Sequence, residues 1–198
     1  MNKPSTKPFA SVRRISTGET VSQYGQSLVL DTDAILVNVK GGFTILDDSD
    51  IQFAFMYRWN VLPHHKTAYV RYSGKKYFGP KQFERICKRL HRLLLPDANQ
   101  VDHVNRIGWD NRRTNLRACS RYENARNANK WSTASGSKFK GVTFDKKKRL
   151  YYARIHVDGR CISLGRSKSE ISAALRYDAA ATRYYGEYAV LNIPEKHV

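Results

Sequence analysis

Short apolar runs bounded by turn residues characterise residues 34–75 of the chain. Residues 34–39, 43–46 and 68–72 are rich in β-branched and aromatic side chains, and their lengths are those of strands. A Gly-Gly pair at 41–42 between the first two runs is typical of a hairpin turn. The pattern predicts a strand-rich region, whereas residues 1–33 hold only short apolar stretches and are set apart as an N-terminal extension of unknown role.

Over residues 80–95 the apolar positions instead follow a helical period. Apolar residues fall at positions 83, 86, 87, 90, 93 and 94, the spacing of one helix face. We expect a helix whose apolar face belongs to the core, and whose Lys/Arg face is either solvated or in contact with a nucleic-acid backbone. His91 lies on this helix among apolar neighbours, where a histidine is more often a hydrogen-bonding residue than a catalyst.

Small polar residues at 130–137 interrupt the pattern and predict a linker. Beyond it, three short alternating segments at residues 138–144, 151–157 and 161–165 predict a three-stranded antiparallel sheet. The chain therefore divides into two domains, and the predicted fold class is α+β.

A helix with small residues on one face is predicted to follow this sheet. Ser167 and Glu170 have the spacing of a capping box, and Gly186 is placed to end the helix. The predicted buried face consists of Ala173, Ala174, Tyr177, Ala180, Ala181 and Tyr184.

Basic residues exceed acidic ones by a wide margin, with 35 Lys and Arg against 17 Asp and Glu and a net charge of +18. The excess is concentrated in residues 51–150, which carry a net charge of +17. Such a balance predicts a polyanionic partner. Because ribosomal and membrane-surface proteins share it, the charge indicates the class of partner and not the activity.

The three cysteines, Cys87, Cys119 and Cys161, lie far apart and show no Cys-x-x-Cys spacing, so we do not expect a structural zinc. No apolar run approaches the roughly 20 residues that span a bilayer. The polar N-terminus also lacks the apolar core of a signal peptide. We therefore expect an intracellular protein with no membrane partner.

The residues most suited to chemistry gather between positions 101 and 117. Asp102 and His103 pair a carboxylate that suits a divalent cation with an imidazole that suits a general base, and the surrounding arginines suit a phosphate backbone. Asp110 and Asn111 predict a turn. Phosphodiester hydrolysis uses a base, a cation and a phosphate-binding surface together.

This segment resembles the HNH endonuclease family, in its phage- and intron-associated homing branch. The resemblance implies a ββα-metal (His-Me finger) core within residues 34–129. In this core the helix at 90–95 would precede the Asp102-His103 pair, and a second strand at 116–118 would lead into a helix from about Ser120. The matching residues are Asp102, His103, Asn111, Arg112, Asn115 and Leu116.

The resemblance also implies roles for individual residues. His103 would be the general base, Asn115 would accept a ring N–H of His103, and Asp102 and Asn124 would hold one Mg²⁺ or Mn²⁺. No small-molecule cofactor is expected. Contacts to double-stranded DNA are expected from Arg112, Arg113, Arg117, Arg126 and Asn127, although Asn127 could instead cap the end of its helix.

The second domain, residues 138–198, resembles the APETALA-type (ethylene-response-factor-like) DNA-binding domain. The resemblance is carried by residues 140–142, 153–155 and 164–165, by the Ala-rich helix, and by Leu191-Asn192. In that family the sheet enters the major groove and the helix braces it from behind. The candidate DNA-reading residues are Lys140, Thr143, Lys146, Lys147, Tyr152, Arg154, His156, Arg160 and Ser163.

Several positions depart from the plant pattern, in which arginine or tryptophan stands where this chain has Thr143, Asp145, Cys161 and Ser163. The resemblance therefore supports the fold of the plant domains better than it supports their preference for a particular DNA sequence. The alternative is a packed α+β module with a solvated basic hairpin.

Together these features predict a site-directed, metal-dependent DNA endonuclease of the homing type, encoded by a phage or mobile element. An alternative is a DNA-binding regulator whose nuclease core no longer cuts. A nonspecific, toxin-like nuclease is a third possibility, which the apparent targeting module disfavours. The target sequence, nicking as opposed to double-strand cleavage, and the oligomeric state stay open, with a monomer favoured.

Overall fold

The computed structural model describes residues 10–64, 67–128 and 136–193. The chain forms two compact units, Met1–Cys119 and Ser120–Val198, which are described one by one. Of the predicted linker at 130–137, only Gly136 and Ser137 lie within the described residues. No helix in the described ranges is long and apolar enough to cross a membrane.

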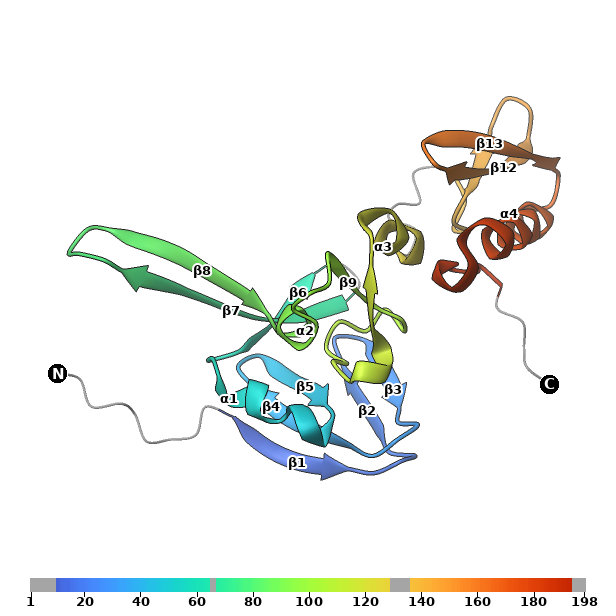
Figure 1. Cartoon of the computed structure of the whole chain (residues 1–198). Coiled ribbons are helices and arrows are strands. Elements are labelled where there is room, and N and C mark those ends of the chain that lie inside the picture. Colours follow the sequence, from blue (N-terminus) through green and yellow to red (C-terminus); the bar gives the residue numbers. More distant parts are fainter. Residues whose placement is uncertain (1–9, 65–66, 129–135, 194–198) are drawn as a thin grey trace. The chain divides into compact units, whose positions relative to one another are not determined.

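The first unit begins with a three-stranded antiparallel sheet of β1 (Ser11–Ile15), β4 (Ala34–Val39) and β5 (Gly42–Leu46), in the order β1-β4-β5 (Figure 1). The two strands predicted at 34–39 and 43–46 are confirmed. The predicted Gly-Gly turn joins them, with Val39 paired to Gly42.

Residues 10–33 are not a separate extension, which corrects the prediction for residues 1–33 in the part that the structure describes. β1 pairs with β4 over its whole length, and β2 (Thr20–Gln23) and β3 (Gln26–Val29) form a hairpin. Ile15, Val21 and Leu30 are buried in the same core as β4 and β5. The sequence concealed this because β1 buries only its last residue, which leaves no alternation to detect.

A second sheet consists of β6 (Asn60–His64), β7 (Thr67–Tyr77) and β8 (Phe83–Arg89), and β7 confirms the strand predicted at 68–72. β7 and β8 form a long hairpin that projects from the rest of the unit (Figure 1). Two short helical turns, η1 (Asp48–Asp50) and α1 (Gln52–Phe55), connect the first sheet to the second.

The helix predicted for residues 80–95 is wrong over most of its length. The segment is β8 followed by a single turn, α2 (Leu90–Leu94). Helices in proteins are stabilised mainly by burying an apolar face. Phe83 and Cys87 are exposed, and only the end of the segment reaches the core, where Leu90 and Leu94 are buried and Leu93 packs against them.

The antiparallel strands β9 (Gln100–His103) and β10 (Leu116–Cys119) hold the motif, with His103 paired to Leu116. η2 (Arg113–Asn115) precedes β10 in the connecting loop. This loop is attached to β5: the Ile45 N–H donates to the Trp109 carbonyl at 3.0 Å, and the Asn111 N–H donates to the Ile45 carbonyl at 2.9 Å. Ile45 and Trp109 are completely buried, so the loop is part of the core.

The second unit begins with α3 (Arg121–Asn127), close to the predicted start at Ser120. Ser120 and Glu123 form a capping box: the hydroxyl accepts from the Glu123 N–H, and the carboxylate accepts from the Ser120 N–H. This arrangement satisfies two N–H groups at the helix start.

The rest of this unit is a three-stranded sheet, β11 (Val142–Asp145), β12 (Leu150–Val157) and β13 (Arg160–Ser167), followed by α4 (Glu170–Tyr185) and the turn η3 (Gly186–Tyr188). The predicted strands are confirmed in order. α4 packs on the sheet through fully buried alanines at 173, 174 and 181.

Both ends of α4 were predicted, with two corrections in detail. Ser169, and not Ser167, caps the helix by accepting from the Ser172 N–H, because Ser167 still belongs to β13. Tyr185 is buried in place of Tyr184. Gly186 ends the helix as predicted, with a φ of 54° that favours glycine.

Candidate active site

His103, the last residue of β9, is the centre of the site in the first unit. Its side chain is buried, with ring centroids of His91 at 5.0 Å and Tyr69 at 5.8 Å. Burial lowers the pKa of His103, while the hydrogen bond to Asn111 and the charges of Asp102 and Asp110 oppose the shift. A lowered pKa keeps the imidazole neutral near pH 7, the form that can accept a proton.

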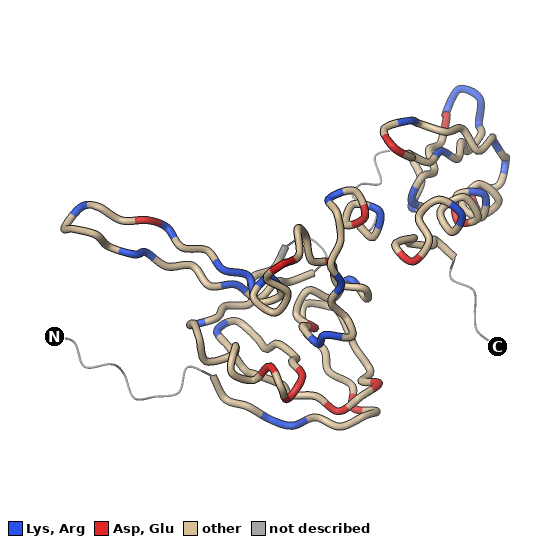
Figure 2. The backbone as a smooth tube through the Cα atoms, in the orientation of Figure 1, with Lys and Arg blue, Asp and Glu red and all other residues tan. Residues whose placement is uncertain are grey.

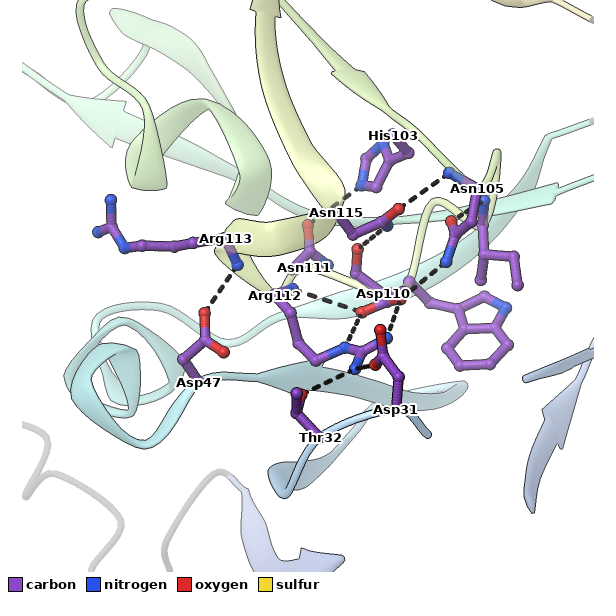
Figure 3. A network of polar contacts seen from close by, with 12 residues as sticks. Asp31, Thr32, Asp47, His103, Asn105, Asp110, Asn111, Arg112, Arg113 and Asn115 are labelled. Carbon is purple, nitrogen blue, oxygen red and sulfur yellow. Dashed lines mark hydrogen bonds and ion pairs between the residues drawn. The ribbon is translucent and has the colours of Figure 1, made fainter. Parts of the chain in front are cut away.

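One ring nitrogen of His103, Nε2, lies 3.4 Å from Asn111 Oδ1 (Figure 3). The Asn111 amide Nδ2 donates to Thr44 Oγ1 at 2.8 Å, and the Thr44 hydroxyl donates to the Trp109 carbonyl at 2.9 Å. A carbonyl oxygen can only accept, so the hydroxyl proton of Thr44 is directed at Trp109. Thr44 must then accept from Asn111, and Asn111 turns its oxygen toward His103.

The direction of this chain assigns the tautomer of His103. Because Asn111 offers an oxygen, Nε2 carries the proton, and Nδ1 is the basic nitrogen. Thr44 and Asn111 are both completely buried, which removes competing water from the chain. The buried polar residues therefore fix the tautomer of His103 and leave Nδ1 as the ring nitrogen that can accept a proton.

Asn115 does not make the contact that the sequence predicted. Its Oδ1 accepts from the Asn105 N–H at 2.9 Å and its Nδ2 donates to the Asp110 carbonyl at 2.7 Å (Figure 3). Asn115 thus braces the loop from within, and Asn111 takes the place beside His103. The sequence could not separate the two because both amides follow His103 in the same loop.

Arg112 is buried, and this corrects its prediction as a DNA contact. Its guanidinium forms two hydrogen bonds of 2.9 Å with the carboxylate of Asp110, which is also completely buried, and a further ion pair with Asp31. The hydrogen bonds that Arg112 donates to Asp110 raise the pKa of Arg112 further above its usual range. With its side chain only 4% exposed, Arg112 is a structural residue of the loop.

The next arginine, Arg113, is half-exposed and pairs with Asp50 at 2.7 Å, while its N–H donates to Asp47. This contact fixes the entrance to η2, and the exposed part of the side chain remains compatible with a DNA contact.

Asp102 stands directly opposite Arg117 across the β9–β10 pair, and the two form an ion pair with an N–O distance of 2.8 Å. Both side chains are largely buried. Within the described ranges no three His, Cys, Asp or Glu residues cluster closely enough to hold a metal ion. A cation beside Asp102 would use this carboxylate and non-protein oxygens, a donor set that suits a hydrated Mg²⁺ or Mn²⁺.

The second unit holds the remaining predicted residues, and α3 carries Asn124, Arg126 and Asn127. Arg126 pairs with Asp158 at 3.3 Å and lies 5.0 Å from the Tyr185 ring centroid. Asn127 is only 5% exposed, which is at odds with a contact to the DNA backbone.

Lys140 is also not placed as predicted. Its ammonium donates to the carbonyls of Arg126 and Ala128, where α3 ends. A lysine at this position satisfies carbonyls that the helix itself leaves without donors.

The predicted reading residues of the sheet share the face opposite α4. The helix side of β12 carries the buried Ala153 and Ile155, so the alternate residues point away from it. Cross-strand pairs on this outer face are Thr143 with Tyr152, Arg154 with Ser163, and His156 with Cys161. The predicted basic residues Lys146, Lys147 and Arg160 are exposed at the strand ends.

Three residues that the sequence analysis did not assign to the site belong to it: Thr44, Asn111 and His91. Thr44 looked like an ordinary strand residue, and Asn111 like a turn residue. His91 is buried, its Nδ1 has no hydrogen-bond partner in the part of the chain that is described, and burial lowers its pKa to about 2. No sequence signal pointed to Thr44, because its role depends on a loop far along the chain.

Comparison with protein families identifies this segment independently. The family model described as HNH endonuclease matches residues 94–126, from the end of α2 through β9, the loop and β10 into α3. A search of curated proteins gives no match to the chain. The matched segment contains Asp102, His103, Asn111, Asn115 and Asn124. Residues 94–126 of this chain are therefore similar to HNH endonucleases.

Proposed function

We propose that this protein is a metal-dependent DNA endonuclease in which His103 is the general base. The observation that supports this most strongly is the buried, neutral His103 whose Nε2 is held by Asn111, within a segment that matches the HNH endonuclease model. A neutral imidazole with one engaged nitrogen and one basic nitrogen is suited to remove a proton from water.

In this proposal each residue has one task. Nδ1 of His103 takes the proton of the attacking water, and Asn111 holds the ring in the required tautomer. Asp102 and Asn124 would hold one Mg²⁺ or Mn²⁺. When bound, the cation stabilises the negative charge that develops on the phosphate and on the leaving oxygen.

The second unit would direct the enzyme to its target, as expected for a homing endonuclease. This is supported by the outer face of β11–β13, on which Arg154 and His156 are exposed and Asp145 is the one acidic residue among the cross-strand pairs. Side chains on a sheet face can reach base edges in the major groove, where all four base pairs are distinguishable.

Supercoiled plasmid incubated with the protein and Mg²⁺ is expected to become nicked or linear, and excess EDTA is expected to stop the reaction. Gel electrophoresis of the products is the measurement. DNA binding without any cleavage in Mg²⁺ or Mn²⁺ would contradict the proposal and support the regulator alternative. A smear of short fragments from every plasmid would contradict site direction.

Replacement of Thr44 by valine is expected to lower the cleavage rate by about 10–100-fold, the usual effect of removing a group that orients a functional imidazole. Valine has a similar shape but no hydroxyl, so Asn111 loses the acceptor that turns its oxygen toward His103. DNA affinity is expected to stay the same.

Thr44→Ser is the matched control, because serine retains the hydroxyl and should retain most of the rate. Single-turnover cleavage and DNA binding are measured side by side for the three proteins. Equal rates for Thr44→Val and Thr44→Ser would show that the hydrogen-bond chain does not set the tautomer.

A further inference from the structure

The β7–β8 hairpin presents two faces of different character. Side chains alternate along a strand, and directly paired residues share a face. The register therefore assigns every residue of the hairpin to one face or the other. One face, called the basic face here, consists of Arg71, Ser73, Lys75, Tyr77, Phe83, Arg85, Cys87 and Arg89.

All eight residues of the basic face are exposed, and four of them are cations. The other face carries Tyr72, Gly74, Lys76, Glu84, Ile86 and Lys88. There Tyr72 packs against the core, and Lys76 stands opposite Glu84, the single acid between residues 71 and 89. Figure 2 shows Lys and Arg along both strands of the projecting hairpin with one acidic position on β8.

Like charges face each other directly across the basic face. Arg71 pairs with Arg89, and Lys75 pairs with Arg85. Such pairs destabilise a sheet, because the Cβ atoms of directly opposite residues lie only about 5 Å apart and like charges on them repel. The arrangement is unfavourable in the free protein and becomes favourable when a polyanion covers this face.

The tip of the same face is aromatic. Tyr77 and Phe83 are 62% and 42% exposed, and their ring centroids are 5.9 Å apart. The ammonium of Lys75 lies 4.0 Å from the Phe83 ring centroid. An apolar tip between rows of cations matches the major groove, which offers thymine methyl groups at its floor and phosphates along both edges.

The dimensions of the hairpin agree with such a partner. A two-stranded ribbon fits the major groove, which is about 12 Å wide and 8.5 Å deep. At about 3.4 Å per residue, the strand from Arg71 to Tyr77 is roughly 24 Å long, so the hairpin can reach across the groove.

We propose that the basic face of the β7–β8 hairpin binds the major groove of double-stranded DNA and forms a second DNA-contacting surface, outside the matched HNH segment. This rests on the proposed function only in that DNA is taken as the substrate. Lys75 and Arg85 neutralise phosphates, and Tyr77 and Phe83 contact the groove floor.

The test compares two double variants of the full chain. Lys75→Gln with Arg85→Gln removes two charges from the basic face. Lys76→Gln with Lys88→Gln removes two charges from the opposite face of the same hairpin and is the matched control. Binding to a labelled mixed-sequence DNA duplex is measured in EDTA over a range of salt concentrations, so cleavage plays no part.

The basic-face variant is expected to bind more weakly than the parent. The slope of log K against log[salt] is negative, and its magnitude is expected to fall by about 2, since each lost phosphate contact removes about 0.9. The control should keep the slope of the parent. The thermal midpoint of the basic-face variant should be equal to or higher than that of the parent, because the like-charge pair is gone.

Equal losses in both variants, or no loss in either, would overturn the proposal. So would a fall in the thermal midpoint of the basic-face variant alone, or a loss of binding to single-stranded RNA that is not seen with duplex DNA. A parent protein that cleaves plasmid while the variants bind normally would leave the nuclease assignment intact and reject the hairpin. A parent that does not cleave, with a reduced slope in the basic-face variant, would reject the nuclease assignment and support DNA binding by the hairpin.

Discussion

Replacement of His103 by alanine is expected to reduce the rate of DNA cleavage by about 10²–10⁴-fold, the usual effect of losing a general base. DNA affinity should change little, because the imidazole is 5% exposed and its Nε2 faces Asn111, so it offers no surface to a phosphate. The rate is measured by single-turnover cleavage with saturating protein and Mg²⁺.

Added imidazole provides a control for His103→Ala. A small base that enters the vacated space should restore part of the rate, whereas it should not affect the parent. The thermal midpoint is measured in parallel, since the substitution leaves a cavity. Cleavage within tenfold of the parent would reject His103 as the base.

Replacement of Arg112 by methionine is expected to lower the free energy of unfolding of the first unit by about 3–5 kcal/mol, the usual cost of removing one partner from a buried ion pair. Asp110 is completely buried and accepts from two nitrogens of Arg112, so the substitution leaves a buried carboxylate without its cation. Methionine fills much of the space of the arginine side chain, so the measured loss reports the missing charge and not a cavity.

Arg14→Met is the matched control for this measurement. Arg14 pairs with Asp48 at 3.0 Å, but the two side chains are 77% and 59% exposed. An exposed pair contributes about 0–1 kcal/mol. Urea unfolding followed by tryptophan fluorescence reports on the first unit through Trp109. Similar small losses in both variants would show that the pair between Arg112 and Asp110 is not a main contact of the loop.

The contrast between β5 and β8 shows when the pattern of apolar residues predicts a secondary-structure element correctly. β5 follows a glycine turn, and its last three residues are buried in the core, so its apolar run has a cause that the sequence shows. β8 carries apolar residues at a helical spacing, yet Phe83 and Cys87 have nothing to pack against and pair across the hairpin instead. Periodicity predicts an element only where the apolar positions are buried.

The arginines of the motif show the same limit for electrostatics. All of Arg112, Arg113 and Arg117 were predicted as DNA contacts, because a cation near a phosphodiester site suggests a phosphate. In the structure each one pairs with a carboxylate, and the partners Asp31 and Asp50 come from distant parts of the chain. The net charge gives the excess of basic over acidic side chains, but the fold determines which basic side chains pair with carboxylates and which are available to contact DNA.

The sequence by itself determined the features that depend on residue type and spacing: the Asp102-His103 pair and the turn at Asp110-Asn111. The strand at 116–118 and the helix from about Ser120 were expected from the family resemblance, and β10 and α3 lie there. Only the tertiary structure decided that Asn111 and not Asn115 holds His103, since the choice depends on Thr44, which lies 67 positions from Asn111. The direction of a hydrogen-bond chain depends on which groups are buried together, and burial is a property of the whole fold.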